Sequence, residues 1–408
     1  MNFAYILKAA AVAVLAGVVL KPMPSASLPS GKPTSVASLP GEGSGGGFPG
    51  SLERTLSPSS SALPIDTAKN ITVLIQGVKP GSGAIVGKNG NTYYVLTAKH
   101  VVRRHSEYDI FTPSGEKYRI KTEEYPDRVT LFPGVDLAVV SFQSDRDYQV
   151  ATLADYNAAS QEQFVFVYGW PISTATVPER EASFQKGTLM QKEIAPLFLR
   201  RDFSSKGYEL VYTNMTRKGM SGGPVLDSGG RLIGIHGIAE AYTHEVETAE
   251  VDGVSIVQPQ EIFLGYSFGM PIKKFLKHPS ASMVPSLKVE RSAASEVPEE
   301  DIRRVALEML RNGEFLPADY SGNETPESLT NQANRMLRFL NLPKAIEGFD
   351  NALDYDARFY RALYGKGIVL TYWKKYDEAI EAFEGALEIN SEFEQARELI
   401  DNIRQANN

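Results

Sequence analysis

The stretch Gly219–Gly237, GMSGGPVLDSGGRLIGIHG, decides the fold and the chemistry of this chain. It places Ser221 among glycines on a tight turn, and strand-like runs lie before and after the turn. Glycine lets the backbone turn without steric cost, so the N–H groups of Gly219 and Ser221 can converge on one spot. The turn therefore predicts a nucleophilic hydroxyl beside a pair of amides that bind an oxyanion.

A serine hydroxyl is a weak nucleophile and needs a base within hydrogen-bond reach. Of the five histidines, His100 lies in TYYVLTAKHVV, where a strand-like run passes into a small-residue turn that can present the imidazole. His236 lies inside the strand-like run RLIGIHGI, and the other three histidines lie in charged or polar loops. We predict that His100 is the base and that His236 either packs or lines the substrate cleft, without a catalytic role.

A neutral imidazole also needs an acceptor that fixes its tautomer and stabilises the imidazolium formed during attack. Asp136 opens the apolar run DLAVVSF, so its carboxylate is expected at a strand end with buried flanks. Asp127 and Asp145 lie in polar loops instead. We therefore predict that Asp136 orients His100.

Short strand-like runs separated by Gly, Pro and Asn extend from about residue 71 to residue 276. Many short strands at close spacing indicate an all-β barrel or sandwich. The runs are ITVLIQG, GAIVG, TYYVLTA, LAVVSF, FVFVYG, ELVYTN, RLIGIHGI and IFLGYSFG.

The order His100, Asp136, Ser221 is the order of the chymotrypsin class. With GSGAIV at Gly81, DLAVV, YGWP at Tyr168 and the Ser221 turn, the sequence resembles the trypsin-like serine proteases, and among them the bacterial HtrA/Deg-type enzymes. The resemblance implies a double six-stranded β-barrel and hydrolysis of peptide bonds without a cofactor. Lys99 and Met220 depart from the residues common in the family, and neither position supplies a reacting atom.

The resemblance also places the floor of the substrate pocket a few residues before the nucleophile. Thr213, Asn214 and Met215 occupy that region and offer no carboxylate, which disfavours cleavage after Lys or Arg. We expect these three residues, with His236, to contact the substrate. No histidine pair has metal-ligand spacing and the chain has no cysteine, so no metal site, disulfide or thiol nucleophile is predicted.

Two segments near the C-terminus repeat at an offset of 34 residues, KAIEGFDNALDYD from Lys344 and EAIEAFEGALEIN from Glu378. Each has Ala, Phe and Ala at spacings of four and three, which define a buried helical stripe. The period and stripe resemble the tetratricopeptide (TPR) repeat family. Because about three repeats are needed for a continuous core, flanking helices are expected at 298–312 and 392–408. Stacked repeats form a groove, which predicts docking of a protein partner or self-association.

The N-terminus has Lys8 ahead of an apolar stretch to Leu20, followed by a segment rich in Pro, Gly and Ser. This pattern predicts export to the periplasm or medium, with residues 1–20 removed or retained as a membrane anchor. A net charge of −7 argues against a nucleic-acid partner. The predicted divisions are a signal peptide or anchor at 1–26, a disordered linker at 27–64, the trypsin-like protease domain at 65–278, a linker at 279–297, and an all-α TPR domain at 298–408 with repeats at about 326–359 and 360–393.

Two functions remain open at this point. The first is a serine endopeptidase that cleaves protein or peptide substrates and docks a partner through its helical domain. The second is an envelope scaffold or chaperone-like binder in which the protease fold is inactive or latent. Cleavage activity distinguishes the two.

Overall fold

The computed structural model describes residues 64–155, 164–172, 180–190, 193–239, 242–251, 254–262, 266–292, 325–338 and 341–407. The predicted signal or anchor segment, the linker up to residue 63 and the flanking helix at 298–312 lie outside these residues. Within the described ranges, no helix combines the length and the apolar character that a membrane crossing requires.

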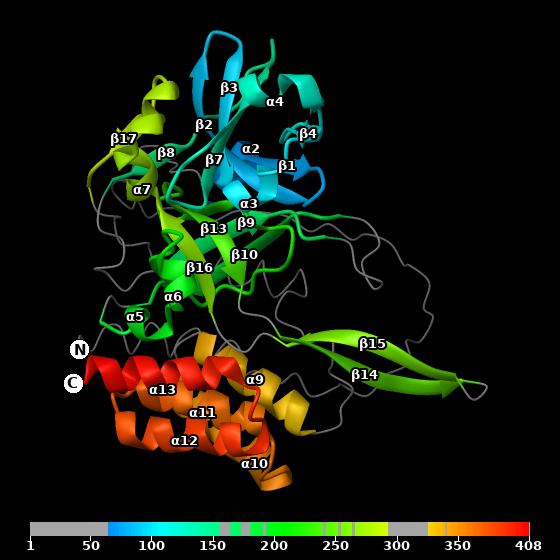
Figure 1. Ribbon diagram of the computed structural model, residues 1–408, viewed down its shortest axis with the longest axis vertical. Helices are drawn as coiled ribbons and strands as arrows, with labels where there is room; N and C mark the ends of the chain where they lie inside the picture. Colours follow the sequence, from blue (N-terminus) through cyan, green and yellow to red (C-terminus); the bar gives the residue numbers. More distant parts are fainter. Residues whose placement is uncertain are drawn as a thin grey trace, which may run out of the picture.

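The first sheet has seven antiparallel strands in the order β5-β4-β1-β2-β3-β7-β6. It forms the upper part of the molecule in Figure 1. Every strand run predicted between residues 71 and 142 lies in this sheet. The strands are β1 (Thr72–Gln76), β2 (Gly81–Asn89), β3 (Thr92–Ala98), β4 (Tyr108–Phe111), β5 (Lys117–Ile120), β6 (Val129–Leu131) and β7 (Leu137–Gln143).

Strand β3 lies between β2 and β7 and sets the position of the residues that follow it. Tyr93, Val95 and Leu96 are fully buried, as expected for a run rich in aromatic and β-branched residues. β3 pairs with β7 in a register that sets Ala98 opposite Leu137. The residues just after β3 and just before β7 therefore meet at one edge of the sheet.

The second sheet has eight strands, of which six follow the path β10-β9-β12-β13-β16-β11. β8 pairs in parallel with β13, and β17 in parallel with β8. Together the two curled sheets fit a trypsin-like double barrel, although they hold seven and eight strands where six each were expected. The strands are β8 (Thr152–Ala154), β9 (Phe164–Gly169), β10 (Ser183–Thr188), β11 (Leu210–Tyr212), β12 (Pro224–Leu226), β13 (Leu232–Ala239), β16 (Ser267–Pro271) and β17 (Lys288–Glu290).

Several short elements and one long hairpin accompany the sheets. The hairpin of β14 (Tyr242–Val251) and β15 (Val254–Ile262) projects from the body of the molecule (Figure 1). The segment predicted as a linker at 279–297 contains a 3-10 helix and β17. The helices are α2 (Pro64–Ile71), α3 (Lys99–Val102), η1 (Thr122–Glu124), α4 (Tyr125–Arg128), α5 (Ala195–Phe198), α6 (Arg201–Ser204), α7 (Ile272–Lys277) and η3 (Pro279–Met283).

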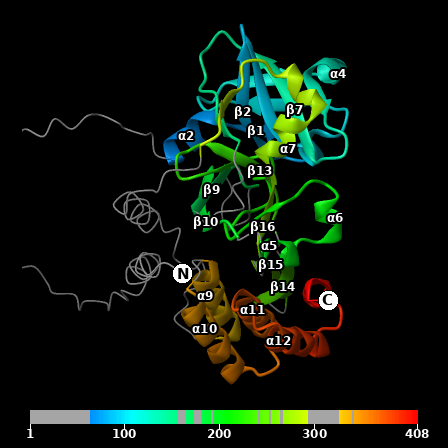
Figure 2. The ribbon, with the colours of Figure 1, turned by 90° about the vertical axis from the view of Figure 1, so that its left-hand side faces the viewer.

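Five helices form the C-terminal part, which lies below the second sheet in both views (Figures 1 and 2). The repeated Ala-Phe-Ala stripe is fully buried in α10 and again in α12. The predicted C-terminal flanking helix is present as α13, while assignment of the helices to the TPR family stays a prediction. The helices are α9 (Pro326–Arg338), α10 (Leu342–Tyr355), α11 (Tyr360–Tyr372), α12 (Tyr376–Ile389) and α13 (Glu394–Ala406).

Candidate active site

His100 and Asp136 meet because the β3–β7 register brings the ends of these strands together. His100 lies in α3, directly after β3, and Asp136 directly precedes β7. One carboxylate oxygen of Asp136 accepts the His100 backbone N–H at 2.9 Å, and the other lies 2.7 Å from His100 Nδ1. A proton on Nδ1 donates to this carboxylate and leaves Nε2 as an acceptor. The carboxylate thus fixes both the position and the tautomer of the imidazole.

Tyr208 is a third member of this arrangement, which the sequence did not reveal. Its hydroxyl donates to Asp136 Oδ2 at 2.5 Å, and the side chain is fully buried. Burial and the neighbouring carboxylate raise the pKa of Tyr208, so the hydroxyl keeps its proton and remains a donor. No local signal marks this tyrosine, because it stands in an ordinary position before β11.

The Asp136 carboxylate is held in its charged form. Burial raises its pKa, but the hydrogen bond and charge of His100 and the hydrogen bond from Tyr208 outweigh burial and leave the pKa below its ordinary value. A buried carboxylate with three donors is satisfied as an anion. It is therefore suited to stabilise positive charge on the adjacent imidazole.

Ser221 follows a tight turn that requires glycine. The Met220 N–H donates to the Arg217 carbonyl at 3.1 Å, and Gly219 has a φ of +95°. A Cβ at Gly219 would lie 2.6 Å from the carbonyl oxygen of Trp170. Only glycine fits this left-handed, crowded position. Met220 is fully buried against side chains of the second sheet. This residue, which departs from the family pattern, therefore contributes to the hydrophobic core.

The same turn leaves two amides available. The Ile172 N–H donates to the Lys218 carbonyl at 2.8 Å, which ties the turn to the segment after β9. Within the described part of the chain, the N–H groups of Gly219 and Ser221 donate to no acceptor. Unclaimed amides beside a serine can bind an oxygen that gains negative charge.

The Ser221 turn packs directly on the segment that carries His100. A Cβ at Gly222 would lie 2.2 Å from Thr97 Oγ1 and 3.1 Å from the Ala98 nitrogen. The Ser221 carbonyl accepts the Ser82 N–H of β2 at 2.8 Å. The half-buried hydroxyl of Ser221 donates to the Gly237 carbonyl at 2.8 Å, and His100 is not its partner in this conformation.

Three of the four predicted substrate-contacting residues are buried. Thr213 and His236 are 1% exposed and Asn214 is fully buried, while Met215 is half-buried. The amide of Asn214 donates to the carbonyls of Val165 and Gln185 at 3.0 and 2.8 Å. Thr213 and Asn214 thus lie on the buried side of the loop before Ser221, and Asn214 attaches this loop to β9 and β10.

His236 is a core residue held in its neutral form. Its Nδ1 lies 2.7 Å from the hydroxyl of Tyr212. Burial and the nearby charge of His100 lower the pKa of His236 to about 3. This histidine therefore stays uncharged in the folded protein over the ordinary working range of pH.

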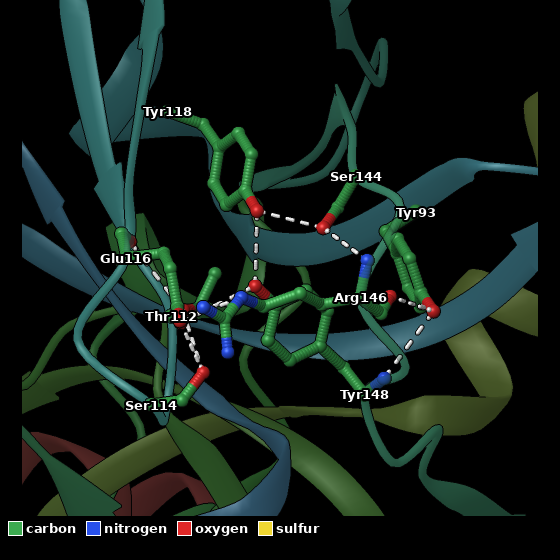
Figure 3. Close-up of polar contacts among 8 residues, drawn as sticks. All are labelled: Tyr93, Thr112, Ser114, Glu116, Tyr118, Ser144, Arg146 and Tyr148. Atoms are coloured by element: carbon green, nitrogen blue, oxygen red, sulfur yellow. Dashed lines mark hydrogen bonds and ion pairs between the residues drawn. The ribbon is translucent and has the colours of Figure 1, made fainter.

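A second polar cluster lies at the other end of the first sheet (Figure 3). Tyr118 contacts Ser144 at 2.6 Å and Tyr148 at 3.1 Å, and the Glu116 carboxylate pairs with Arg146 at 2.9 Å. These residues join the β4–β5 turn to the segment that leaves β7, whereas His100 and Asp136 lie where β7 begins. The polar groups named here bond to one another, so the cluster fastens the two segments together at this end of the sheet. In the described ranges, no group of acidic or histidine side chains is arranged to hold a metal ion.

Comparison with known proteins covers the same part of the chain. The family model of the trypsin-like peptidase domain matches residues 81–235. The serine protease Do-like HtrA of Lactococcus lactis subsp. cremoris is 28% identical over 185 residues, which is 44% of this chain and 42% of that protein. The probable membrane transporter protein MamO of Paramagnetospirillum magneticum is 28% identical over 186 residues, 44% of this chain and 26% of that protein. The chain thus spans less than half the length of these curated relatives.

Two solved structures are similar at low scores. The Rv3671c protease in its inactive form has a TM-score of 0.37 at 13% identity, covering 55% of this chain and 93% of that chain. Deg5 has a TM-score of 0.35 at 18% identity, covering 52% of this chain and 89% of that chain. The family match spans His100, Asp136 and Ser221, and the chain therefore contains a trypsin-like peptidase domain with HtrA-like relatives.

Proposed function

We propose that this protein is a serine endopeptidase that hydrolyses peptide bonds of protein substrates through His100, Asp136 and Ser221. The trypsin-like peptidase domain supports a serine peptidase in general. The two-point contact between Asp136 and His100, next to a serine flanked by two unclaimed amides, carries the finer assignment.

The reaction begins with a change at Ser221. Its hydroxyl leaves the Gly237 carbonyl and donates to His100 Nε2, which takes the proton as the oxygen attacks the peptide carbonyl. The carbonyl oxygen gains negative charge and is held by the N–H groups of Gly219 and Ser221. Asp136 stabilises the imidazolium, which then protonates the leaving amine. Water repeats the sequence on the acyl-enzyme with His100 again as the base.

The proposed substrate pocket lacks a negative charge at its floor. Of the three residues predicted there, Thr213 and Asn214 are buried behind the loop, and the half-buried Met215 carries no carboxylate. A Lys or Arg side chain of a substrate would lose its hydration there without gaining a carboxylate. We therefore propose that cleavage after Lys or Arg is disfavoured.

The resting hydrogen bond of Ser221 favours one version of the alternative function. A hydroxyl that donates to Gly237 is not yet activated by His100. A latent peptidase that acts as an exported scaffold or chaperone-like binder, with partners docked on its helical domain, is therefore the second candidate. Activity measurements separate the two candidates.

The test is labelling of the full chain by a fluorophosphonate together with cleavage of unfolded casein. We expect wild type to label and cleave, and Ser221→Ala to lose both by about 10⁵-fold or more. Ser282→Ala is the matched control, because Ser282 is exposed in η3 and should behave as wild type. Absence of labelling in wild type would reject the peptidase and favour the scaffold.

A further inference from the structure

The helical part presents three of its five helices to the peptidase domain. Asn402 of α13 donates to the Leu197 carbonyl at 2.9 Å, and Arg200 lies 3.2 Å from Glu398. The Tyr372 ring of α11 lies 6.4 Å from that of Phe198. Figure 1 shows α11 and α13 next to α5, with α10 and α12 farther away. The inner face of α9, α11 and α13 therefore packs on α5 and on the segment that follows β11.

The deepest contact of this interface joins Arg338, the last residue of α9, to Thr213. The Arg338 guanidinium donates to the Thr213 carbonyl at 2.9 Å, and the Thr213 hydroxyl donates to the Arg338 carbonyl at 2.8 Å. Arg338 is 8% exposed and Thr213 is 1% exposed. The last carbonyls of a helix lack partners within the helix, and Thr213 supplies one here. The two groups thus satisfy each other where water is excluded.

Thr213 is the first residue of a connected path to the nucleophile. Its hydroxyl accepts the Thr188 N–H at 2.9 Å, which ties it to β10. The Asn214 carbonyl accepts the Thr216 N–H at 3.0 Å and the Ser267 hydroxyl at 2.7 Å. The turn that carries Gly219 and Ser221 follows directly. Movement at Thr213 therefore reaches the proposed oxyanion-binding amides along a short backbone segment that is buried and hydrogen-bonded at Asn214 and Thr216.

From this path we infer that Arg338 is a positioning residue of the peptidase, which holds the loop at 213–221 in its working shape through Thr213. The inference rests on the proposed function. A guanidinium that donates to a carbonyl is a strong, charge-assisted partner, and its loss leaves a buried acceptor without that donor. The helical domain is then part of the enzyme and not only a platform for partners.

The variant Arg338→Met removes the guanidinium and keeps an unbranched side chain that suits a helix. We expect kcat and the rate of fluorophosphonate labelling to fall about tenfold at a temperature where the protein is folded, with KM little changed. Hydrogen exchange of amides in residues 213–221 should become faster. Arg338→Lys keeps the charge without the planar donor pair, and an intermediate effect is expected.

Arg404→Met is the matched control, because Arg404 is an exposed arginine of α13 that pairs with Glu384 of α12 at 2.7 Å. It should leave labelling, kcat and exchange unchanged. If Arg338→Met fails to fold, Thr213→Val removes the second hydrogen bond of this contact, from the Thr213 hydroxyl to the Arg338 carbonyl, and slower labelling is again expected. Wild-type labelling and exchange in a folded Arg338→Met or Thr213→Val protein overturn the inference. Absence of labelling in wild type instead rejects the proposed function and the inference with it.

Discussion

The two halves of the candidate site are held in different ways. His100 and Asp136 are 36 residues apart and are joined by neighbouring strands of one sheet. The Ser221 turn is held by contacts with β2, with the segment around Ile172, and with Gly237. Through Thr213 it also reaches Arg338, which is 125 residues farther along the chain.

This difference indicates which half of the site other parts of the molecule can influence. A pair fixed by adjacent strands has little freedom, because the sheet register sets its geometry. A turn supported by several distant segments changes shape when any one of them moves. We therefore expect the base and its orienting group to be preformed, and the nucleophile turn to respond to the helical domain.

The largest expected effect tests the preformed half. Asp136→Asn should lower kcat by about 10⁴-fold while the fold is retained, because an amide stabilises the wrong tautomer of His100 and cannot balance the imidazolium. The measurement is peptide hydrolysis, with folding checked by circular dichroism. Asp127→Asn, an exposed change in α4, serves as the control. Activity near wild type in Asp136→Asn would contradict the assignment of the orienting group.

A smaller effect is expected where the two halves meet, at Tyr208. Its hydroxyl contacts Asp136, and its ring lies against Gly237, where an added Cβ would come 2.2 Å from the ring. Tyr208→Phe keeps the ring and removes one donor from a buried carboxylate, so the pKa of Asp136 should rise and stability should fall by about 2 kcal/mol. We expect kcat to fall by less than about tenfold, since His100 still holds the carboxylate.

The control for Tyr208→Phe is Tyr118→Phe, which removes a hydrogen-bonded hydroxyl at the far end of the first sheet (Figure 3). That variant should lose stability without losing kcat in the folded protein. Equal kcat losses in both variants would show that Tyr208 acts only through stability.

The sequence predicted those parts of the fold that depend on local pattern. The run TYYVLTA became β3 with the predicted bounds, and the Ala-Phe-Ala stripe became the buried face of α10 and α12. The hairpin at 242–262 was missed, although Asp252 and Gly253 form a dipeptide typical of hairpin turns. β17 has three residues, of which only the middle one is half-buried, so nothing in its sequence distinguishes it from a linker.

The contacts that connect the site to the rest of the molecule could not be predicted. Tyr208 meets Asp136 across 72 residues, and Arg338 meets Thr213 across 125. Each of these residues has an ordinary local pattern, because the contact arises only when separate sheets and helices pack. His236 was predicted to pack or to line the substrate cleft, and packing within β13 places it in the core.

The smallest effect on activity concerns the sheet behind the nucleophile, where the change is expected in stability as a function of pH. The folded-state pKa of His236 is about 3, well below the ordinary value of 6.5. As pH falls below about 6.5, His236 becomes protonated in the unfolded chain but stays neutral in the folded protein. Stability should therefore fall by about 1.4 kcal/mol per pH unit between pH 6 and pH 4 from this residue alone.

His236→Gln should remove that part of the slope, because glutamine can accept the Tyr212 hydroxyl and does not titrate. The measurement is denaturant unfolding of both proteins from pH 7.5 to pH 4, with exposed His105→Gln as the control that keeps the slope. The difference between wild type and His236→Gln should be constant above pH 7 and change steadily below pH 6. Parallel curves throughout would mean that His236 takes up its proton in the folded state. The support behind Gly237 and the Ser221 turn would then be looser than the packing of this sheet implies.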